Sequence, residues 1–226
     1  LMGDQLKLLK AVMKTGKPVV LVLIKGRPLN LNWAAENIPA ILDAWYPGQE
    51  GGNAIADVLF GDYNPAGRLP VTYYKSVDQL PKFENYDMEG RTYRYFHKTP
   101  LYPFGFGLSY TKFNYSDLKL SAVKMKSNET IKVSFQLSNV GKVAGEEVVQ
   151  LYLKDKFGSV VRPVLELRDF QKVKLNAGES KTIEFTIDKE KLSFYNNKLE
   201  WTAEPGDFEV MIGASSADLK LKADFE

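Results

Sequence analysis

The sequence predicts two structural classes in one chain: an α/β part over residues 1–74 and an all-β sandwich over residues 111–226, joined by an ordered connection over residues 75–110. Three changes along the 226 residues carry this prediction. Apolar residues first recur at helical spacing and in continuous runs, then lose any period, and finally alternate with polar residues in short stretches. The length is enough for one large domain or two modest ones, each with its own core.

The α/β part opens with a predicted helix. Asp4 offers an N-cap, and the apolar residues Leu6, Leu9 and Met13 fall at helical spacing with lysines between them. Gly16 is a natural C-terminal stop. We therefore expect one amphipathic helix before the first strand.

Two strands and a second helix are predicted next. PVVLVLI (18–24) does not alternate, which is typical of a strand covered on both faces, and AILDAW (40–45) is a second apolar strand. The stretch 51–61 predicts a short helix with an apolar inward side, formed by Ala54, Ile55, Val58 and Leu59. This order predicts a parallel sheet with helices on its faces. Two strands alone are too few for a stable sheet, so we expect the domain to begin upstream of residue 1.

The connection and the second half follow different patterns. Residues 75–110 are dense in aromatic, proline and glycine residues. Since a disordered linker would carry few aromatics, we expect those rings to pack on neighbouring domains. Beyond residue 110, short alternating runs separated by turn signals predict a sandwich of two antiparallel sheets. Its strands are expected at 131–137, 149–153, 183–187, 208–212 and 219–221.

Composition excludes several classes of protein and site. The 30 basic and 28 acidic side chains are spread along the chain and leave a net charge of +2, which is no electrostatic footprint for nucleic acid. The absence of cysteine excludes disulfides, thiolate metal sites and a cysteine nucleophile. No run approaches the roughly 20 apolar residues of a membrane span. We expect neither a nucleic-acid partner nor a membrane span.

Residues suited to catalysis are few, and no arrangement of them in the sequence forms a site. His97 is the only histidine and has no carboxylate nearby in sequence, so a loop histidine is favoured over a triad base. Neither histidine clusters nor calcium-loop spacing indicate a metal site. A retaining glycosidase needs two carboxyl groups about 5–5.5 Å apart, and sequence spacing places no such pair. Solvated loop charges are the favoured interpretation of two acidic clusters: Glu84, Asp87 and Glu89, and Glu50, Asp57 and Asp62.

The glycines of GQEGG (48–52) raise the alternative of a ligand cradle. They match neither a dinucleotide fingerprint nor a P-loop. Glu50 would repel a phosphate, whereas it suits the positive end of a helix dipole. We favour an architectural role, in which Pro47 and Gly48 end the strand and the two later glycines admit close backbone packing.

The same region resembles the signature of a known family. YPGQEGGNAIADVLFGDYNPAGRLPVT (46–72) is similar to that of family 3 glycoside hydrolases, the β-glucosidase and β-xylosidase enzymes. Three flanking stretches agree: KPVVLVLIKGRPL, GRTYRYF and LYPFGFGLSYTKF. VSFQLSNVGKVAGEEVVQLYL and LRDFQKVKLNAGESKTIEFTI resemble the fibronectin type III-like domain that closes many of these enzymes. The resemblance covers essentially the whole chain.

This resemblance implies a (β/α)8-type barrel, then an α/β sandwich domain of which residues 1–74 are the C-terminal piece, then the fibronectin type III-like sandwich. In the family plan the aspartate nucleophile belongs to the barrel and the acid/base glutamate to a segment before residue 1. No catalytic residue is therefore assigned in this chain, substrate-binding residues stay unassigned, and neither a metal nor a cofactor is implied.

The resemblance also implies the chemistry and the partners of the parent enzyme. It would remove terminal β-linked glucose or xylose with retention, through a glycosyl-enzyme intermediate. This chain, inactive alone, would support the catalytic unit as the partner of the barrel and of the rest of the sandwich domain. A periplasmic or secreted location suits such an enzyme.

Two other functions stay open at this point. A carbohydrate-binding module would show an exposed row of coplanar rings, although core or interdomain packing is the favoured role of the tryptophans, Trp33, Trp45 and Trp201. A pure interaction or spacer domain is the other, because fold alone does not decide function. Three residues of the connection are weaker candidates for the rim of a sugar pocket, but pinning the connection to the sandwich domain is the favoured role of Arg91, Tyr93 and Arg94.

Overall fold

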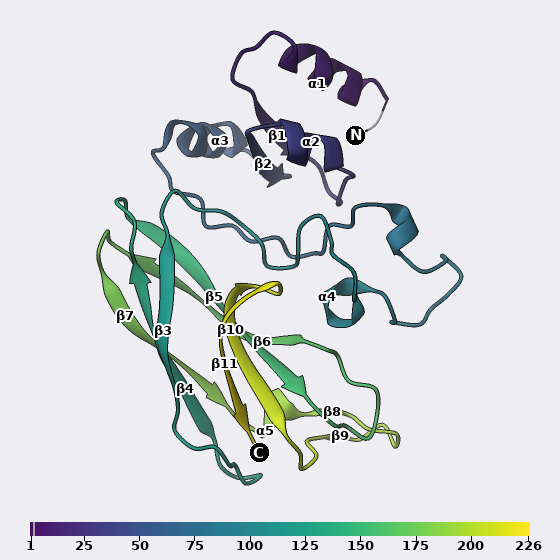
Figure 1. The fold of residues 1–226 in the computed structure, drawn as a ribbon, viewed down its shortest axis with the longest axis vertical. Coiled ribbons are helices and arrows are strands. Elements are labelled where there is room, and N and C mark those ends of the chain that lie inside the picture. Colours follow the sequence, from purple (N-terminus) through teal and green to yellow (C-terminus); the bar gives the residue numbers. More distant parts are fainter. Residues whose placement is uncertain (2) are drawn as a thin grey trace.

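The computed structural model describes residue 1 and residues 3–226. Figure 1 shows the chain running from an α/β part (purple to blue), through a connection between the two halves, into a β-sandwich that contains the C-terminus. The predicted succession of an α/β class and an all-β class is confirmed. None of the helices over these residues is both long and apolar enough to cross a membrane.

Three helices and a two-stranded sheet make up the described α/β part. Its elements are α1 (Gln5–Met13), β1 (Val20–Ile24), α2 (Asn32–Asn37), β2 (Ala40–Trp45) and α3 (Gly51–Phe60). β1 and β2 pair in parallel, with Val20 opposite Ala40, as the order of elements predicts. A small core is formed by buried side chains from these elements and the segment after α3: Leu9, Leu23, Leu31, Ala34, Ile38 and Tyr73.

Two burial predictions for the α/β part are wrong. Ile55 and Val58 of α3 are half-buried, but Ala54 and Leu59 of the predicted inward side are exposed. β1 is not covered on both faces, since its first and last residues are exposed. Both differences have one cause, because a sheet of two strands has too little surface to cover a whole helix side or both faces of a strand.

The β-sandwich consists of two antiparallel sheets with strand orders β11-β10-β5-β6 and β3-β4-β7. The strands are β3 (Phe113–Leu120), β4 (Ile131–Asn139), β5 (Gly145–Asp155), β6 (Glu166–Leu175), β7 (Ser180–Ile187), β10 (Phe208–Ser215) and β11 (Asp218–Phe225). Helix α5 (Lys189–Leu192) and the short strands β8 (Phe194–Tyr195) and β9 (Trp201–Thr202) lie at the end far from the α/β part (Figure 1). β4 alternates as predicted, so that Ile131, Val133, Phe135 and Leu137 enter the core between the sheets.

Two strands of the sandwich have no counterpart among the predicted ones. β3 lacks strict alternation, because its register shifts around Asp117, whose φ is 58°. β6 carries the polar residues Asp169 and Gln171 on the same face as the buried Val173. In both strands the period-two signal is interrupted, which hides them from a pattern search.

The connection is ordered and only partly packed. It contains a short 3-10 helix η1 (Val77–Gln79) and a one-turn helix α4 (Thr92–Tyr95). Tyr93 stacks on Phe104 at 4.2 Å between ring centroids and meets the edge of Tyr152 from β5. Phe83 and Tyr86, in contrast, are 91% and 90% exposed. The expectation that the aromatics pack on neighbouring domains therefore holds for part of the connection.

Candidate functional site

The carboxyl ends of β1 and β2 bring polar and aromatic side chains to one edge of the α/β part. Lys25 directly follows β1, while Asp43 and Trp45 belong to β2. The backbone N–H of Lys25 donates to the carbonyl of Trp45 at 3.1 Å, so the two strand ends are tied together. In open parallel sheets ligands bind outside this edge.

Lys25 is the centre of this edge. Its side chain is only 6% exposed, and Nζ lies 2.9 Å from Asp43 Oδ2 and 3.7 Å from the ring centroid of Trp45. The ion pair lacks good hydrogen-bond geometry, and Nζ has no other acceptor among the described residues. The indole face supplies a cation–π contact in place of solvent. A buried ammonium group is costly unless it is paired. The Asp43 carboxylate and the Trp45 ring supply that pairing for Lys25.

Tyr73 completes the cluster from the segment after α3. Its hydroxyl donates to Asp43 Oδ2 at 2.6 Å, and its ring lies 5.1 Å from Lys25 Nζ. Burial raises the pKa of the Tyr73 phenol well above its ordinary value, and the neighbouring Asp43 carboxylate raises it further. Tyr73 is therefore a neutral donor at physiological pH. The second carboxylate oxygen of Asp43, Oδ1, is buried without a partner among the described residues.

Trp45 and Tyr46 form a strained corner at the same edge. Trp45 has a φ of 52°, a left-handed conformation that costs a non-glycine residue about 1–3 kcal/mol. Tyr46 is 76% exposed. One edge of its ring lies against Gly26, where an added Cβ would stand 2.5 Å from Tyr46 Cε2. Gly26 is therefore the residue that lets this ring lie on the backbone.

The two acidic clusters considered in the sequence lie in different segments of the chain. Glu50 precedes α3 and accepts a 2.6 Å hydrogen bond from Asn53 Nδ2. Glu84 and Asp87 are exposed on the connection. Over residues 1 and 3–226 no three acidic or histidine side chains come close enough to hold a metal ion.

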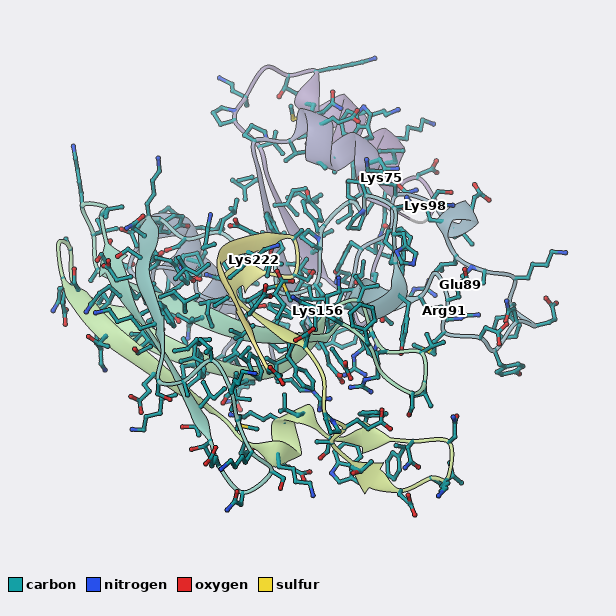
Figure 2. All side chains as sticks on the ribbon, turned by 60° about the horizontal axis from the view of Figure 1, so that its bottom comes forward. Lys75, Glu89, Arg91, Lys98, Lys156 and Lys222 are labelled. Carbon is teal, nitrogen blue, oxygen red and sulfur yellow. The ribbon has the colours of Figure 1, made fainter. Side chains whose placement is uncertain are left out.

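His97 is exposed at an open pocket of about 390 Å³ in the connection. The pocket is also lined by Asp78, Asn85, Glu89, Phe96 and Lys98. Figure 2 shows Glu89 and Lys98 along the connection, apart from Lys156 and Lys222 on the β-sandwich. The histidine makes no hydrogen bond or ion pair with the described residues, so no carboxylate orients it as a triad would require.

The three rim candidates of the connection are committed to contacts within the chain. Arg91 donates from Nε to the carbonyl of Asp87 at 3.0 Å and from Nη2 to two further carbonyls, which braces the loop before it. Tyr93 accepts a hydrogen bond from the N–H of Leu167 at 3.1 Å. Arg94 pairs with Glu166 at 3.0 Å, so the last two pin the connection to the β-sandwich.

The tryptophans do not form a flat platform. Trp33 is half-buried beneath Lys10, and Trp45 stacks on Lys25. Trp201 is 44% exposed and donates from Nε1 to Glu190, while its ring is tilted by 56° against that of Tyr195. The three tryptophans therefore do not supply the coplanar row that would favour a carbohydrate-binding module.

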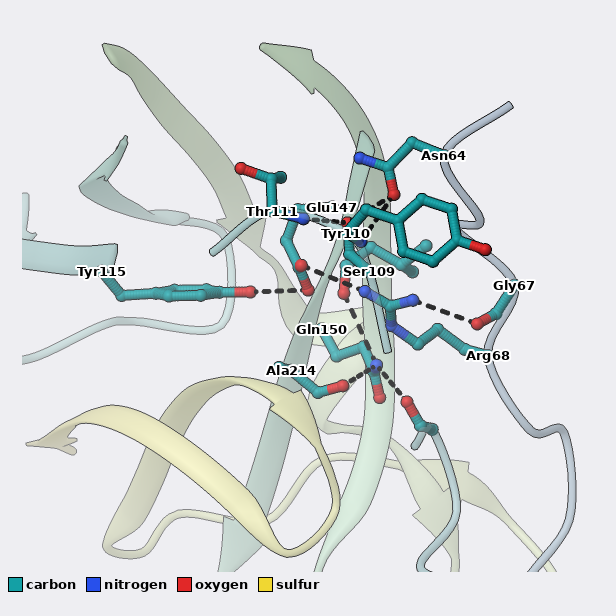
Figure 3. Close-up of polar contacts among 12 residues, drawn as sticks. Asn64, Gly67, Arg68, Ser109, Tyr110, Thr111, Tyr115, Glu147, Gln150 and Ala214 are labelled. Carbon is teal, nitrogen blue, oxygen red and sulfur yellow. Dashed lines mark hydrogen bonds and ion pairs between the residues drawn. The ribbon is translucent and has the colours of Figure 1, made fainter. Parts of the chain in front are cut away.

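A buried ion pair joins the two halves of the chain (Figure 3). Arg68, from the segment after α3, places Nη2 3.0 Å from Glu147 Oε2 on β5, with side chains only 8% and 5% exposed. Tyr115 of β3 donates to the other carboxylate oxygen at 3.1 Å. Burial raises the pKa of Glu147, and the Arg68 charge and both hydrogen bonds act in the opposite direction.

Two amides extend this junction. Asn64 donates to the carbonyl of Ala144 at 2.8 Å and accepts from the Ser109 hydroxyl at 2.9 Å (Figure 3). Gln150 donates to the carbonyl of Ala214 at 2.7 Å and to that of Gly105 at 3.2 Å. The motifs NPAGR and PFGFG therefore have a structural explanation, since they join the α/β part to the sandwich.

Sequence reasoning missed both clusters, although a signal for each exists. Lys25 directly follows the apolar run 18–24, and Asp43 interrupts the apolar strand AILDAW. Glu147 stands at the start of a strand that is otherwise largely buried. Charged residues inside or beside apolar runs are rarely buried without a partner, and a search for such positions would have found them.

Comparison with protein families matches both parts of the chain. The family model described as glycosyl hydrolase family 3 C-terminal domain matches residues 1–110, and that of the fibronectin type III-like domain matches residues 147–216. The periplasmic beta-glucosidase of Salmonella typhimurium is 47% identical over 96% of this chain, and a beta-xylosidase of Formosa agariphila is 46% identical over 98%. The chain covers only 30% and 31% of these two proteins.

Solved structures agree with this match. A β-glucosidase from Erythrobacter marinus superposes on the whole chain with a TM-score of 0.90 at 43% identity, over 30% of its own length. Beta-glucosidase 3B from Thermotoga neapolitana, in complex with α-D-glucose, gives 0.89 at 36% identity, over 34% of its length. The Listeria innocua β-glucosidase with isofagomine gives 0.85 at 37% identity, covering 97% of this chain and 32% of that one.

Proposed function

The chain belongs to the family 3 glycoside hydrolases, and from this premise we propose that it is the structural, non-catalytic C-terminal part of a retaining β-glycosidase. It spans about 30% of the length of the curated relatives it matches. The complete enzyme hydrolyses terminal β-linked glucose or xylose through a glycosyl-enzyme intermediate. Its nucleophile and its acid/base residue lie outside these 226 residues.

One observation carries this proposal. A β-glucosidase and a β-xylosidase each match nearly all of the chain, but the chain accounts for less than a third of either protein. The structure is consistent with a supporting role, because Glu50 is bonded to Asn53 while Glu84 and Asp87 are exposed elsewhere. A retaining glycosidase needs its two carboxyl groups on opposite sides of one glycosidic bond.

The surface of the α/β part suggests where the remainder of the enzyme packs. Large apolar side chains are exposed on α1, β1 and α3, including Leu8 at 65%, Ile24 at 62% and Phe60 at 84%. We propose that these side chains contact the remainder of the enzyme, since contiguous exposed apolar surface is typical of an interaction surface. In this proposal residues 1–74 complete the α/β sandwich domain, residues 75–110 connect, and residues 111–226 form the fibronectin type III-like domain.

Hydrolysis assays test the proposal. The 226-residue chain and the complete parent protein are compared on p-nitrophenyl β-glucoside and p-nitrophenyl β-xyloside. We expect turnover by the complete protein and none by the chain, and the ratio of the two rates assigns the preferred sugar. Turnover by the 226-residue chain alone would overturn the proposal and return Glu50, Glu84 and Asp87 to consideration.

A further inference from the structure

The Trp45–Tyr46 corner lies where a parallel α/β sheet is expected to meet its ligand. β1 and β2 end at the same edge, and the loop that follows β2 starts with Tyr46. Ligands of open α/β sheets bind outside the carboxyl ends of the strands, since the loops there carry side chains of variable chemistry on a rigid base.

The Trp45–Tyr46 corner combines strained backbone with buried polar groups that lack hydrogen bonds. Trp45 keeps a left-handed φ of 52° although it is not glycine. Lys25 stays buried with Nζ lacking a hydrogen bond, and Asp43 Oδ1 is buried without a partner in the described part of the chain. Strained backbone and unsatisfied buried groups persist where surrounding contacts over-determine them, and they cluster at functional positions.

The contacts of Lys25 explain why the corner does not relax. The ammonium is held between the Asp43 carboxylate at 2.9 Å and the Trp45 ring at 3.7 Å, and its own backbone N–H holds the Trp45 carbonyl at 3.1 Å. Both the ring and the backbone of Trp45 are thereby fixed. The position of the next residue, Tyr46, follows from them.

Tyr46 is presented to solvent beside Gly26. Its ring edge lies 2.5 Å from where a Cβ on Gly26 would stand, so the glycine leaves room for the ring there, and 76% of the residue is exposed. A pyranose has C–H groups on its faces and hydroxyls at its rim, and a phenol ring that is apolar on its face and polar at its tip suits both. Resting on the proposed function, we propose that Tyr46 contacts a sugar ring of the substrate in the complete enzyme and that Lys25 is its positioning residue.

The test uses the complete enzyme with Tyr46→Ala, Tyr46→Phe and, as a matched control, Phe157→Ala, an exposed aromatic on the loop after β5. Tyr46→Ala is expected to raise KM for the p-nitrophenyl glycosides about tenfold, with kcat and the melting temperature little changed. Tyr46→Phe keeps the ring face and loses only the hydroxyl, so it is expected to raise KM less than Tyr46→Ala does, while Phe157→Ala is expected to keep the wild-type KM within about twofold. An unchanged KM in Tyr46→Ala, or a change confined to melting temperature, overturns the proposal, because either marks a ring that only packs against other protein.

Lys25 is tested by Lys25→Met and its conservative counterpart Lys25→Arg. Lys25→Met is expected to raise KM, as Tyr46→Ala does. Lys25→Arg keeps a cation over the Trp45 ring and is therefore expected to have a KM close to that of the wild type. A Lys25→Met enzyme with wild-type KM overturns the positioning role; if that variant does not fold, Lys25→Gln, which keeps a polar side chain but removes the cation over the Trp45 ring, is measured in its place, and a wild-type KM there overturns the role. Inactivity of the unmodified enzyme on every β-glycoside would contradict the proposed function itself, whereas an active enzyme indifferent to Tyr46→Ala contradicts only this inference.

Discussion

Removing the charge of Glu147 is predicted to destabilise the chain strongly, because it leaves Arg68 buried without its counter-ion. The two side chains are 5% and 8% exposed, and Nη2 and Oε2 are 3.0 Å apart. Arg68 Nε already has no partner among the described residues, so in Glu147→Gln the guanidinium would keep the carbonyl of Gly67 at 3.0 Å as an acceptor but lose its counter-ion. Breaking a buried pair on one side costs about 3–5 kcal/mol. Against a typical domain stability of about 5–15 kcal/mol, this is a large fraction.

The assay is urea denaturation of the complete enzyme, in which the rest of the α/β sandwich domain is present. A loss of the junction is also expected to separate the unfolding transitions of the α/β part and the sandwich. The matched control is Glu184→Gln, which removes an equally short but exposed pair with Lys132, at 2.9 Å and 49% and 59% exposure. That change is expected to cost about 0–1 kcal/mol.

A double variant separates the charge from the shape of the junction. Glu147→Leu combined with Arg68→Met removes both charges and is expected to recover part of the stability lost in the single variant, since the buried Tyr115 hydroxyl still loses its acceptor. A loss below about 1 kcal/mol in Glu147→Gln, similar to that in Glu184→Gln, would refute the reasoning that this pair is buried and holds the two halves together.

Two further predictions concern the junction and the far end of the sandwich. Gly105→Ala is expected to lower the melting temperature more than Gly178→Ala, because both positions have positive φ (80° and 75°) but only at Gly105 does an added Cβ collide with Gln150. Equal losses in the two variants would contradict that clash. The hydroxyl and N–H of Ser159 donate to Glu204 and hold its pKa below the ordinary value. These bonds stabilise the fold at pH values above the ordinary glutamate pKa, and their contribution is lost as pH falls through the lowered pKa. Ser159→Ala should therefore raise the Glu204 pKa, measured by NMR titration. An unchanged Glu204 pKa in this variant would show that the hydroxyl contact is absent in solution.

The fold class was predictable because the hydrophobic period is a local property. β4, β5, β7, β10 and β11 each keep their alternation or their apolar run, and each appears where the pattern predicts a strand. β3 and β6 do not, since a register shift at Asp117 and polar residues on an inward face of β6 break the period. The extent of burial of α3 and β1 depends on neighbours that a local pattern does not contain.

The candidate sites were less predictable, because they join residues far apart in sequence. Arg68 and Glu147 are 79 residues apart, and no local rule pairs them. The left-handed backbone of Trp45 carries no sequence signal, because tryptophan is not a residue that usually adopts it. The resemblance of residues 46–72 to a glycosidase signature identified the family but gave this chain no catalytic residue.

The central claim is that the catalytic carboxylates lie outside this chain, and covalent trapping of the intermediate tests it most directly. The complete enzyme is treated with a 2-deoxy-2-fluoro-β-glycosyl fluoride, which slows hydrolysis of the glycosyl-enzyme, and the labelled peptide is identified by mass spectrometry. We predict a single labelled carboxylate on a peptide outside residues 1–226. A label on Glu50, Glu84, Asp87 or any other carboxylate of this chain would contradict the account.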